Sequence, residues 1–485
     1  MTETSAAVHP RSARDLDAAT PADRDRWVDA LRVGSLFVVV LGHWFMVALT
    51  PSGQISNTLA ILPSLQPVTW LLQVMPLFFL VGGIAHAHSL ESLAARHPDR
   101  TGRYAAFVRS RAERLLRPTF AFLAVWVGLG VVAHVTGLTG RSGGDSDGAL
   151  VRSALVMVPQ LLWFVGIYLG VCACAPGMRR LHARWGPAVP VALVALAVIV
   201  DVVRFGGGPE LVGNINFALV WLALHQLGFA WRDGVLTSRA GWAMVVVGFG
   251  GMLAAVIAGP YPVSMVGLPG ETVSNMAPPT AALLAQGIGI CGLAVVVRSP
   301  MGRLLTRPRA WKTVLAGAPF AMTAFLWHLT ALLFALMVLR GLNIEQPEVG
   351  SIGWWLSRPL LVAMLAVVTA GLVGVFVRFD RAGTTRPERG VVATRRRHGE
   401  GRRGWVDLLA GVAALVIFFG VLIVSVAGVD VLGNRPVFFL LGEVTPAIGL
   451  VVLGAGVGLL AVTGRVDQAA DQSAPAAVRT AAIAD

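Results

Sequence analysis

The sequence predicts an all-α protein, a polytopic bundle of about 12 transmembrane helices. Hydrophobic residues make up 55% of the 485 residues, charged residues make up 13%, and the mean hydropathy is +0.71. The apolar runs are about 20 residues long, which is the length that crosses the hydrocarbon core of a bilayer as a helix. An open sheet cannot satisfy its backbone polar groups in lipid, and runs this long and uniform are not typical of barrel strands. These observations favour a helical membrane protein without a soluble domain.

The expected elements follow the chain as apolar runs separated by polar loops. The first run follows a polar stretch and has no small-residue cleavage site, so we expect an uncleaved anchor rather than a signal peptide. The segment 260–279 is rich in Pro and Gly and is expected outside, either as a cap over a cavity or as a plain loop. We expect spans at residues 31–50, 68–88, 119–138, 154–175, 187–203, 215–231, 241–259, 280–297, 313–339, 356–377, 405–427 and 437–463.

The placement of basic residues predicts the orientation. Of the 39 Lys and Arg residues, 32 fall in the two tails and in alternate loops, whereas six fall in the remaining loops. This asymmetry predicts a multi-pass protein of the plasma (inner) membrane with both termini in the cytoplasm. The loop 89–118 alone carries seven arginines. The net charge of +13 is therefore a topology signal, and since no basic stretch is interleaved with aromatic residues, we expect no nucleic-acid partner.

Composition divides the chain into five parts. Polar or basic stretches interrupt the apolar pattern near the N-terminus, after the tenth span and near the C-terminus. The expected parts are a disordered cytoplasmic tail (1–26), a ten-span membrane domain (27–378), a basic cytoplasmic linker (379–404), two additional transmembrane helices (405–463) and a disordered tail (464–485). The three cysteines form no disulfide framework, and Cys172 and Cys174 have no histidine nearby in the sequence, so no metal site is expected.

The first span carries polar residues that are costly in a membrane. Asp29 and Arg32 are followed, eleven residues after the arginine, by His43. At 100° per residue, His43 returns to within about 20° of Arg32 and lies about 16 Å further along the helix, near the bilayer midplane. A charged group at that depth costs about 2.5–3.5 kcal/mol on insertion scales, so it is expected to face a protein interior or a wet cavity. Asp29 lies within the i,i+3 range for pairing with Arg32.

Five short motifs together resemble the acyltransferase 3 family of integral membrane O-acyltransferases. The resemblance covers roughly residues 27–378 and leaves the last two spans outside. Two positions depart from the family pattern, since Gly82 stands where serine is common and Phe325 where tyrosine is common. The motifs are D-x-L-R followed by ten residues and a histidine (Asp29, Leu31, Arg32, His43), the second-span run Pro76–Gly83, R-x-x-R (Arg111, Arg114), W-F-x-x-x-Y (Trp163, Phe164, Tyr168) and Phe325–His328.

The resemblance implies a reaction and its partners. The family transfers acyl groups, commonly acetyl from acetyl-CoA, to hydroxyls of envelope carbohydrates, lipids or secondary metabolites. It therefore implies acyl-CoA as the donor, O-acetylation in the cell envelope as the process, and a hydroxyl-bearing glycan or lipid as the acceptor. The remaining expected partner is the bilayer, and no metal is expected.

Each expected site residue has a structural alternative. His43 is expected to be the proton acceptor for the hydroxyl, since a positioned base contributes about 10²–10⁴-fold, or a transient carrier of the acyl group, but it could be a hydrogen-bonded core residue. Arg32, with Asp29 beside it, is expected to orient the donor or meet a CoA phosphate, but it could be an interfacial anchor. Arg111 and Arg114 share a face and could grip the diphosphate, but a cytoplasmic loop is basic for topology in any case.

Other intramembrane polar residues are interpreted as structural. His328 is placed in this class, together with His134, Asp201, His225 and Glu443. Two other function classes stay open, namely a secondary transporter or exporter of a small molecule and a catalytically inactive sensor or assembly protein. Transporters tend to show inverted repeats and paired broken helices, and this sequence shows no internal repeat.

Overall fold

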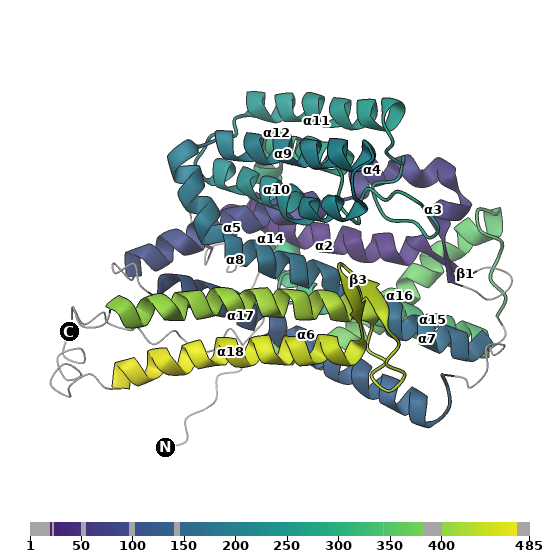
Figure 1. Cartoon of the computed structure of the whole chain (residues 1–485). Helices are drawn as coiled ribbons and strands as arrows, with labels where there is room; N and C mark the ends of the chain where they lie inside the picture. The colour runs from purple at the N-terminus through teal and green to yellow at the C-terminus, as the bar shows by residue number, and fades with distance from the viewer. Residues whose placement is uncertain are drawn as a thin grey trace, which may run out of the picture.

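The computed structural model describes residues 20–21, 24–49, 55–96, 102–139, 146–342, 344–381 and 400–472. This part of the chain contains 11 helices that are long and apolar enough to cross a membrane, or up to 12 if a bent helix pair counts as one span. Figure 1 shows the long helices running roughly alongside one another in a single bundle. The protein is therefore the all-α polytopic bundle that the sequence predicts.

The long helices follow one another along the chain in the predicted order. The α-helices are α2 (Arg26–Met46), α3 (Thr58–Ile61), α4 (Thr69–Leu72), α5 (Met75–Arg96), α6 (Arg103–Val135), α7 (Ser146–Gln160), α8 (Leu162–Trp185), α9 (Ala188–Phe205), α10 (Asn216–Arg232), α11 (Ser238–Ala258), α12 (Ala281–Val296), α13 (Arg298–Leu305), α14 (Pro308–Gly317), α15 (Ala321–Gly341), α16 (Ile352–Arg381), α17 (Glu400–Ala427) and α18 (Pro446–Gln472). Two 3-10 helices, η1 (Pro63–Val68) and η2 (Glu210–Ile215), and two antiparallel hairpins, β1 (Val47–Leu49) with β2 (Ile55–Asn57) and β3 (Val437–Phe439) with β4 (Gly442–Val444), complete the described elements.

Several predicted boundaries are wrong for local reasons. The predicted span 313–339 is two helices, α14 and α15, which meet at residues 318–320. The predicted span 437–463 begins with the β3–β4 hairpin, so α18 starts only at Pro446, a residue suited to a first helical turn. α18 then continues to Gln472, into the stretch predicted as a tail. The rest of that tail, most of the tail 1–26 and most of the linker 379–404 lie outside the described residues.

The loop predicted at 89–118 is mostly helix. α5 continues to Arg96, and α6 starts at Arg103, because the polar residues of this stretch extend the apolar helices beyond the span itself. Arg111 and Arg114 therefore lie on a helix, eight and eleven residues after its first residue.

One end of the bundle carries a network of charged side chains, and we call it the arginine-rich end. Arg179 at the end of α8 donates to both carboxylate oxygens of Asp233, at 2.6 and 2.9 Å, and to Glu91 of α5 at 3.3 Å. Arg232 at the end of α10 also contacts Glu91, at 3.1 Å. The Arg179 guanidinium holds the pKa of the Asp233 carboxyl, which follows α10, below its usual range. These ion pairs join the ends of α5, α8 and α10.

Glycines allow the close helix crossings that place the central residues. A Cβ added at Gly83 of α5 would lie 2.1 Å from the carbonyl oxygen of His225, and one added at Gly228 of α10 would lie 2.2 Å from that of Leu80. The two backbones therefore touch, as small residues permit in membrane bundles. This contact brings the next turn of α5, which carries His86, against α10.

The segment 260–279 packs onto the bundle at the opposite end from the charged network. Trp70 Nε1 donates to the Val263 carbonyl at 2.8 Å, and Thr69 Oγ1 accepts from Met265 N at 2.9 Å. Ser264 and Met265 are fully buried. The segment therefore lies against α4 and against Gln73, which follows that helix, rather than projecting as a plain loop.

Candidate functional site

A histidine pair joins α2 to α15. His43 Nδ1 and His328 Nε2 are 3.0 Å apart, and the second ring nitrogen of His328, Nδ1, lies 2.6 Å from the Phe325 carbonyl oxygen. A carbonyl only accepts, so a neutral His328 carries its proton on Nδ1 and its Nε2 accepts. His43 must then donate from Nδ1, which leaves the lone pair of His43 on Nε2. The pair therefore presents His43 as a base with a defined free nitrogen.

The pair is buttressed by tryptophan and aliphatic packing. Trp44 Nε1 donates to the His328 carbonyl oxygen at 3.2 Å, and His328 is fully buried whereas His43 is partly exposed. Trp44 also belongs to a small core cluster with Val40 and residues of α15 and α16. His328, interpreted from the sequence as structural, thus lies in direct contact with the residue expected to be catalytic.

His43 lies in the last turn of α2 rather than in its middle. The helix ends at Met46 because the chain turns there into the β1–β2 hairpin. The position near the bilayer midplane, predicted from an apolar run to residue 50, is therefore shifted toward one end of the helix. The helix is continuous from Arg26, so Arg32 still lies about 16 Å below His43 on a shared face.

The expected pairing of Asp29 with Arg32 is present. Arg32 Nη2 lies 3.2 Å from Asp29 Oδ1, and Arg24 Nε contacts the other carboxylate oxygen at 2.6 Å. The Arg32 side chain is 43% exposed. Asp29 therefore holds the guanidinium near the arginine-rich end while leaving part of it open to a ligand.

Three arginines lie within electrostatic range of one tyrosine. The guanidinium groups of Arg32, Arg111 and Arg114 are near enough to the Tyr168 side chain to interact with it electrostatically. Arg111 is partly buried over the Phe107 ring, 5.4 Å from its centroid, and its buried Nε has no hydrogen-bond partner among the described residues. A buried guanidinium N–H without a partner is costly unless an acceptor arrives. The arrangement suits an anionic ligand.

Tyr168 connects the arginines to the histidine pair through aromatic rings. It packs on Gly82, where an added Cβ would lie 2.9 Å from the tyrosine ring. Its ring centroid is 5.7 Å from that of Phe164, which is 5.5 Å from that of Phe325, and the Phe325 ring in turn lies 5.9 Å from His328. All five sequence motifs therefore meet in one connected region of the bundle.

A second buried histidine pair was not identified from the sequence. His86 Nδ1 and His225 Nε2 are 2.9 Å apart, and His86 Nε2 faces Cys172 Sγ at 3.4 Å and the Tyr168 hydroxyl at 3.5 Å. His225, interpreted from the sequence as a structural polar residue, is part of a cluster beside Tyr168. The available signal was an intramembrane histidine one turn after the glycines of the second-span motif.

The other polar residues of the sequence analysis lie elsewhere. Asp201 accepts from Asn216, Tyr261 and the Ala281 backbone, which makes it a buried structural contact at the end opposite the charged network. His134 lies 3.9 Å from Asp430, and Glu443 is exposed in β4. None of these three touches the motif residues in the contacts described.

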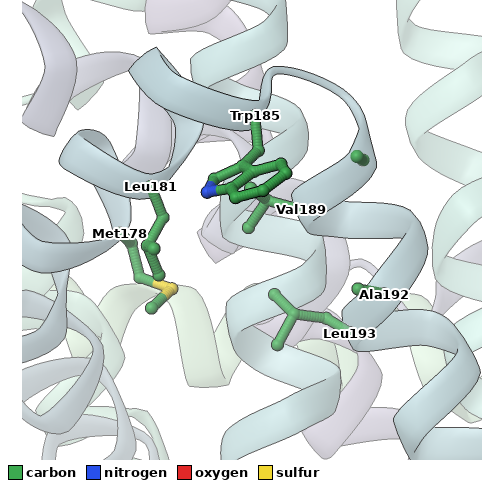
Figure 2. A pocket seen from close by; sticks show the side chains of 7 residues that line it. Met178, Leu181, Trp185, Val189, Ala192 and Leu193 are labelled. Atoms are coloured by element: carbon green, nitrogen blue, oxygen red, sulfur yellow. The ribbon is translucent and has the colours of Figure 1, made fainter.

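An apolar groove opens between the end of α8 and the start of α9 (Figure 2). Figure 2 shows the Trp185 ring close to Val189, with Met178, Leu181, Ala192 and Leu193 along the rest of the groove. None of the expected site residues lines it, and its walls offer nothing to a polar donor. Among the described residues, no group of three or more His, Cys, Asp or Glu side chains is placed to hold a metal ion.

The fold and this arrangement define a polytopic membrane protein in which buried histidine and aromatic side chains lie beside arginines that are partly or fully exposed. Residues 25–377 match the family model described as an acyltransferase domain, that of the acyltransferase 3 family, so the chain belongs to that family and is a membrane acyltransferase. The comparisons with curated proteins and with solved structures found no match. α17 and α18 lie beyond the matched stretch.

Proposed function

We propose that the protein transfers an acyl group, acetyl in the simplest case, from acyl-CoA to a hydroxyl of an envelope carbohydrate, lipid or secondary metabolite. The observation that carries the proposal is the hydrogen-bond chain from the Phe325 carbonyl through His328 to His43, which leaves His43 Nε2 able to accept a proton. Family membership supports acyl transfer as the reaction class.

The proposed reaction is a single displacement at the thioester. The acceptor oxygen attacks the carbonyl carbon of the acyl group while His43 Nε2 takes the hydroxyl proton. The carbon–sulfur bond then breaks, the CoA thiolate leaves and receives that proton, and the new ester stays on the acceptor. His328 stabilises the transient imidazolium by accepting from its Nδ1–H, as the orienting group of a catalytic triad does.

The donor is proposed to enter from the arginine-rich end. Arg32, Arg111 and Arg114 supply positive charge for the CoA phosphates, and charge-assisted contacts of this kind are the strong ones. The distance of about 16 Å along α2 between Arg32 and His43 would be spanned by the flexible arm that joins the CoA diphosphate to its thioester. Asp29 would keep Arg32 oriented toward that path.

The proposed orientation has the arginine-rich end and both termini in the cytoplasm of a plasma-membrane protein. The exposed Thr272, in the segment 260–279, would then face outward, whereas the exposed Ser110 of α6 would face inward. Thr272→Cys in a background lacking the native cysteines should react with an impermeant thiol reagent in intact cells, and Ser110→Cys should react only after permeabilisation. The reverse pattern would overturn the orientation.

The direct test of the function uses purified protein in lipid nanodiscs. Wild-type protein should release CoA from acetyl-CoA when a mixture of envelope lipids and glycans is present, and mass spectrometry should detect the added acetyl ester. Cells that lack the protein should lack the same ester. An intact acetyl-CoA pool with a folded protein, together with unchanged envelope esters in the deletion strain, would reject the proposal.

A further inference from the structure

The two C-terminal helices hold the helix that carries the donor arginines. α6 begins after Gly102, a residue with φ of +81° and no side chain, and no residue of its own N-terminal turn caps it. The first amide groups of a helix have no intrahelical partner and need an acceptor from elsewhere. Asp407 of α17 provides one, because its Oδ1 accepts from Ala105 N at 2.9 Å and its Oδ2 accepts from Gly102 N at 3.2 Å.

This cap is favourable both in its electrostatics and in its geometry. A carboxylate at a helix N-terminus interacts with the partial positive charge of the helix dipole. Both oxygens of Asp407 are used, one on the N-cap amide and one on the third helical amide. Arg111 lies about two turns further along the same helix. The start of the donor helix therefore depends on a residue that lies outside the matched family domain.

The same helix, α17, also packs along one face of α8. Added Cβ atoms at Gly166 and Gly170 would lie 3.0 Å from Leu422 and 3.0 Å from Phe418, so α17 packs directly on this glycine face. Tyr168 lies between the two glycines in the sequence and points the other way, onto Gly82 of α5. α8 is thus held between α17 and α5.

Further contacts, at the ends of α17 and α18, attach these two helices to the rest of the bundle. Near the end of α17, Val429 N donates to the Leu155 carbonyl of α7 at 3.1 Å. Near the end of α18, an added Cβ at Gly464 would lie 3.4 Å from Arg109 Nη1 of α6. Figure 1 shows α17 and α18 side by side along one flank of the bundle, with α17 between α18 and α8.

We infer that the α17–α18 pair is a positioning element for the donor site, and that Asp407 is a positioning residue for Arg111 and Arg114. The inference rests on the proposed function, since it assigns the effect to acyl-CoA binding. Without the cap, the first turns of α6 would fray, and the donor would have to order them on binding. The affinity for the donor should fall, whereas the chemical step at His43 and His328, on α2 and α15, should be little changed.

The test compares three full-length variants by steady-state kinetics. Asp407→Ala should raise the donor KM about three- to tenfold, the range expected for loss of a helix cap, with kcat and the acceptor KM within twofold of wild type. Asp407→Asn keeps one acceptor oxygen and should recover part of the donor affinity. Asp201→Ala is the matched control, because Asp201 also bonds a helix-start amide, Ala281 N at 2.6 Å, but at the far end of the bundle.

The results that would overturn the positioning role differ from those that would overturn the proposed function. An unchanged donor KM in folded Asp407→Ala, or an equal rise in Asp201→Ala, would overturn the positioning role. If Asp407→Ala does not fold, the donor KM of Asp407→Asn relative to wild type decides instead. Amide hydrogen exchange over residues 102–107 of Asp407→Asn should then be faster than in wild type. Failure of the proposed function would appear differently, as an absence of acyl-CoA turnover by the wild-type protein itself.

Discussion

Replacing His328 tests whether the histidine pair works as a unit. In the structure, His328 Nδ1–H donates to the Phe325 carbonyl, so its Nε2 accepts from His43 Nδ1–H at 3.0 Å. His328→Ala removes that acceptor, and His43 is then free to rotate or to carry its proton on Nε2, the nitrogen that must be vacant. We expect kcat to fall while the donor KM stays near the wild-type value.

The size of the effect follows from the lost hydrogen bond and the lost tautomer. A neutral hydrogen bond contributes about 0.5–1.5 kcal/mol, which corresponds to roughly a two- to twelvefold loss of rate. Loss of the correct tautomer adds to this, and in the serine-protease triad the corresponding substitution lowers kcat about 10⁴-fold. We therefore expect His328→Ala to lower kcat by at least about tenfold. His328→Gln, whose amide oxygen can accept from His43, should recover part of the rate.

The assay is acyl transfer in nanodiscs at saturating acyl-CoA, with thermal stability measured alongside. His328 is fully buried, and its truncation should cost about 2–4 kcal/mol of stability, as large-to-small core substitutions do. His182→Ala is the matched control, since His182 is also buried and hydrogen-bonded, to Gln226 at 2.9 Å, but lies at the arginine-rich end. A folded His328→Ala with wild-type kcat, or an equal loss in His182→Ala, would refute the reasoning.

The remaining predictions concern the donor and the charged network. Arg111→Ala and Arg114→Ala should each raise the donor KM at least about tenfold, since a hydrogen bond to a charged group contributes about 1.5–3 kcal/mol, and unchanged donor KM values would reduce both residues to topology markers. Arg179 holds the pKa of Asp233 below its usual range, so the carboxylate stabilises the fold above its unfolded pKa of about 3.9 and loses that effect as the pH falls through the lower folded value. Asp233→Asn should therefore lower Tm at pH 7, and the difference from wild type should shrink below about pH 4. A difference that stays constant from pH 7 to pH 3.5 would contradict this assignment.

The fold was predictable because the membrane imposes strong constraints on a sequence. Each expected span contains a long helix in the structure, although its bounds differ in places, since about 20 apolar residues in lipid have few alternatives to a helix. The ends of the helices were less predictable, because polar residues can extend a helix beyond its apolar run. Arg111 and Arg114 illustrate this, since they were placed in a loop and lie on α6. The break between α14 and α15 falls at Gly317 and Pro319, which are helix stop signals, but it was missed because the apolar run continues across it.

The site was predictable where residues lie on one helix and less so where helices meet. The spacing of Asp29 and Arg32 predicted their ion pair, because both lie on one regular helix. The contact between His43 and His328 depends on how α2 packs against α15, which periodicity alone does not specify. The pair of His86 and His225 depends in the same way on the glycine crossing of α5 and α10.

The measurement that tests the central claim most directly is the acyl-transfer rate of His43 variants. His43→Ala and His43→Gln should insert and fold, and they should bind acyl-CoA as wild type does, because the proposed donor contacts lie at Arg32, Arg111 and Arg114. With acyl-CoA at saturation, their turnover should be at least about 100-fold below wild type, the low end for loss of a general base. A folded variant that turns over within a few-fold of wild type would contradict the assignment of His43 as the proton acceptor.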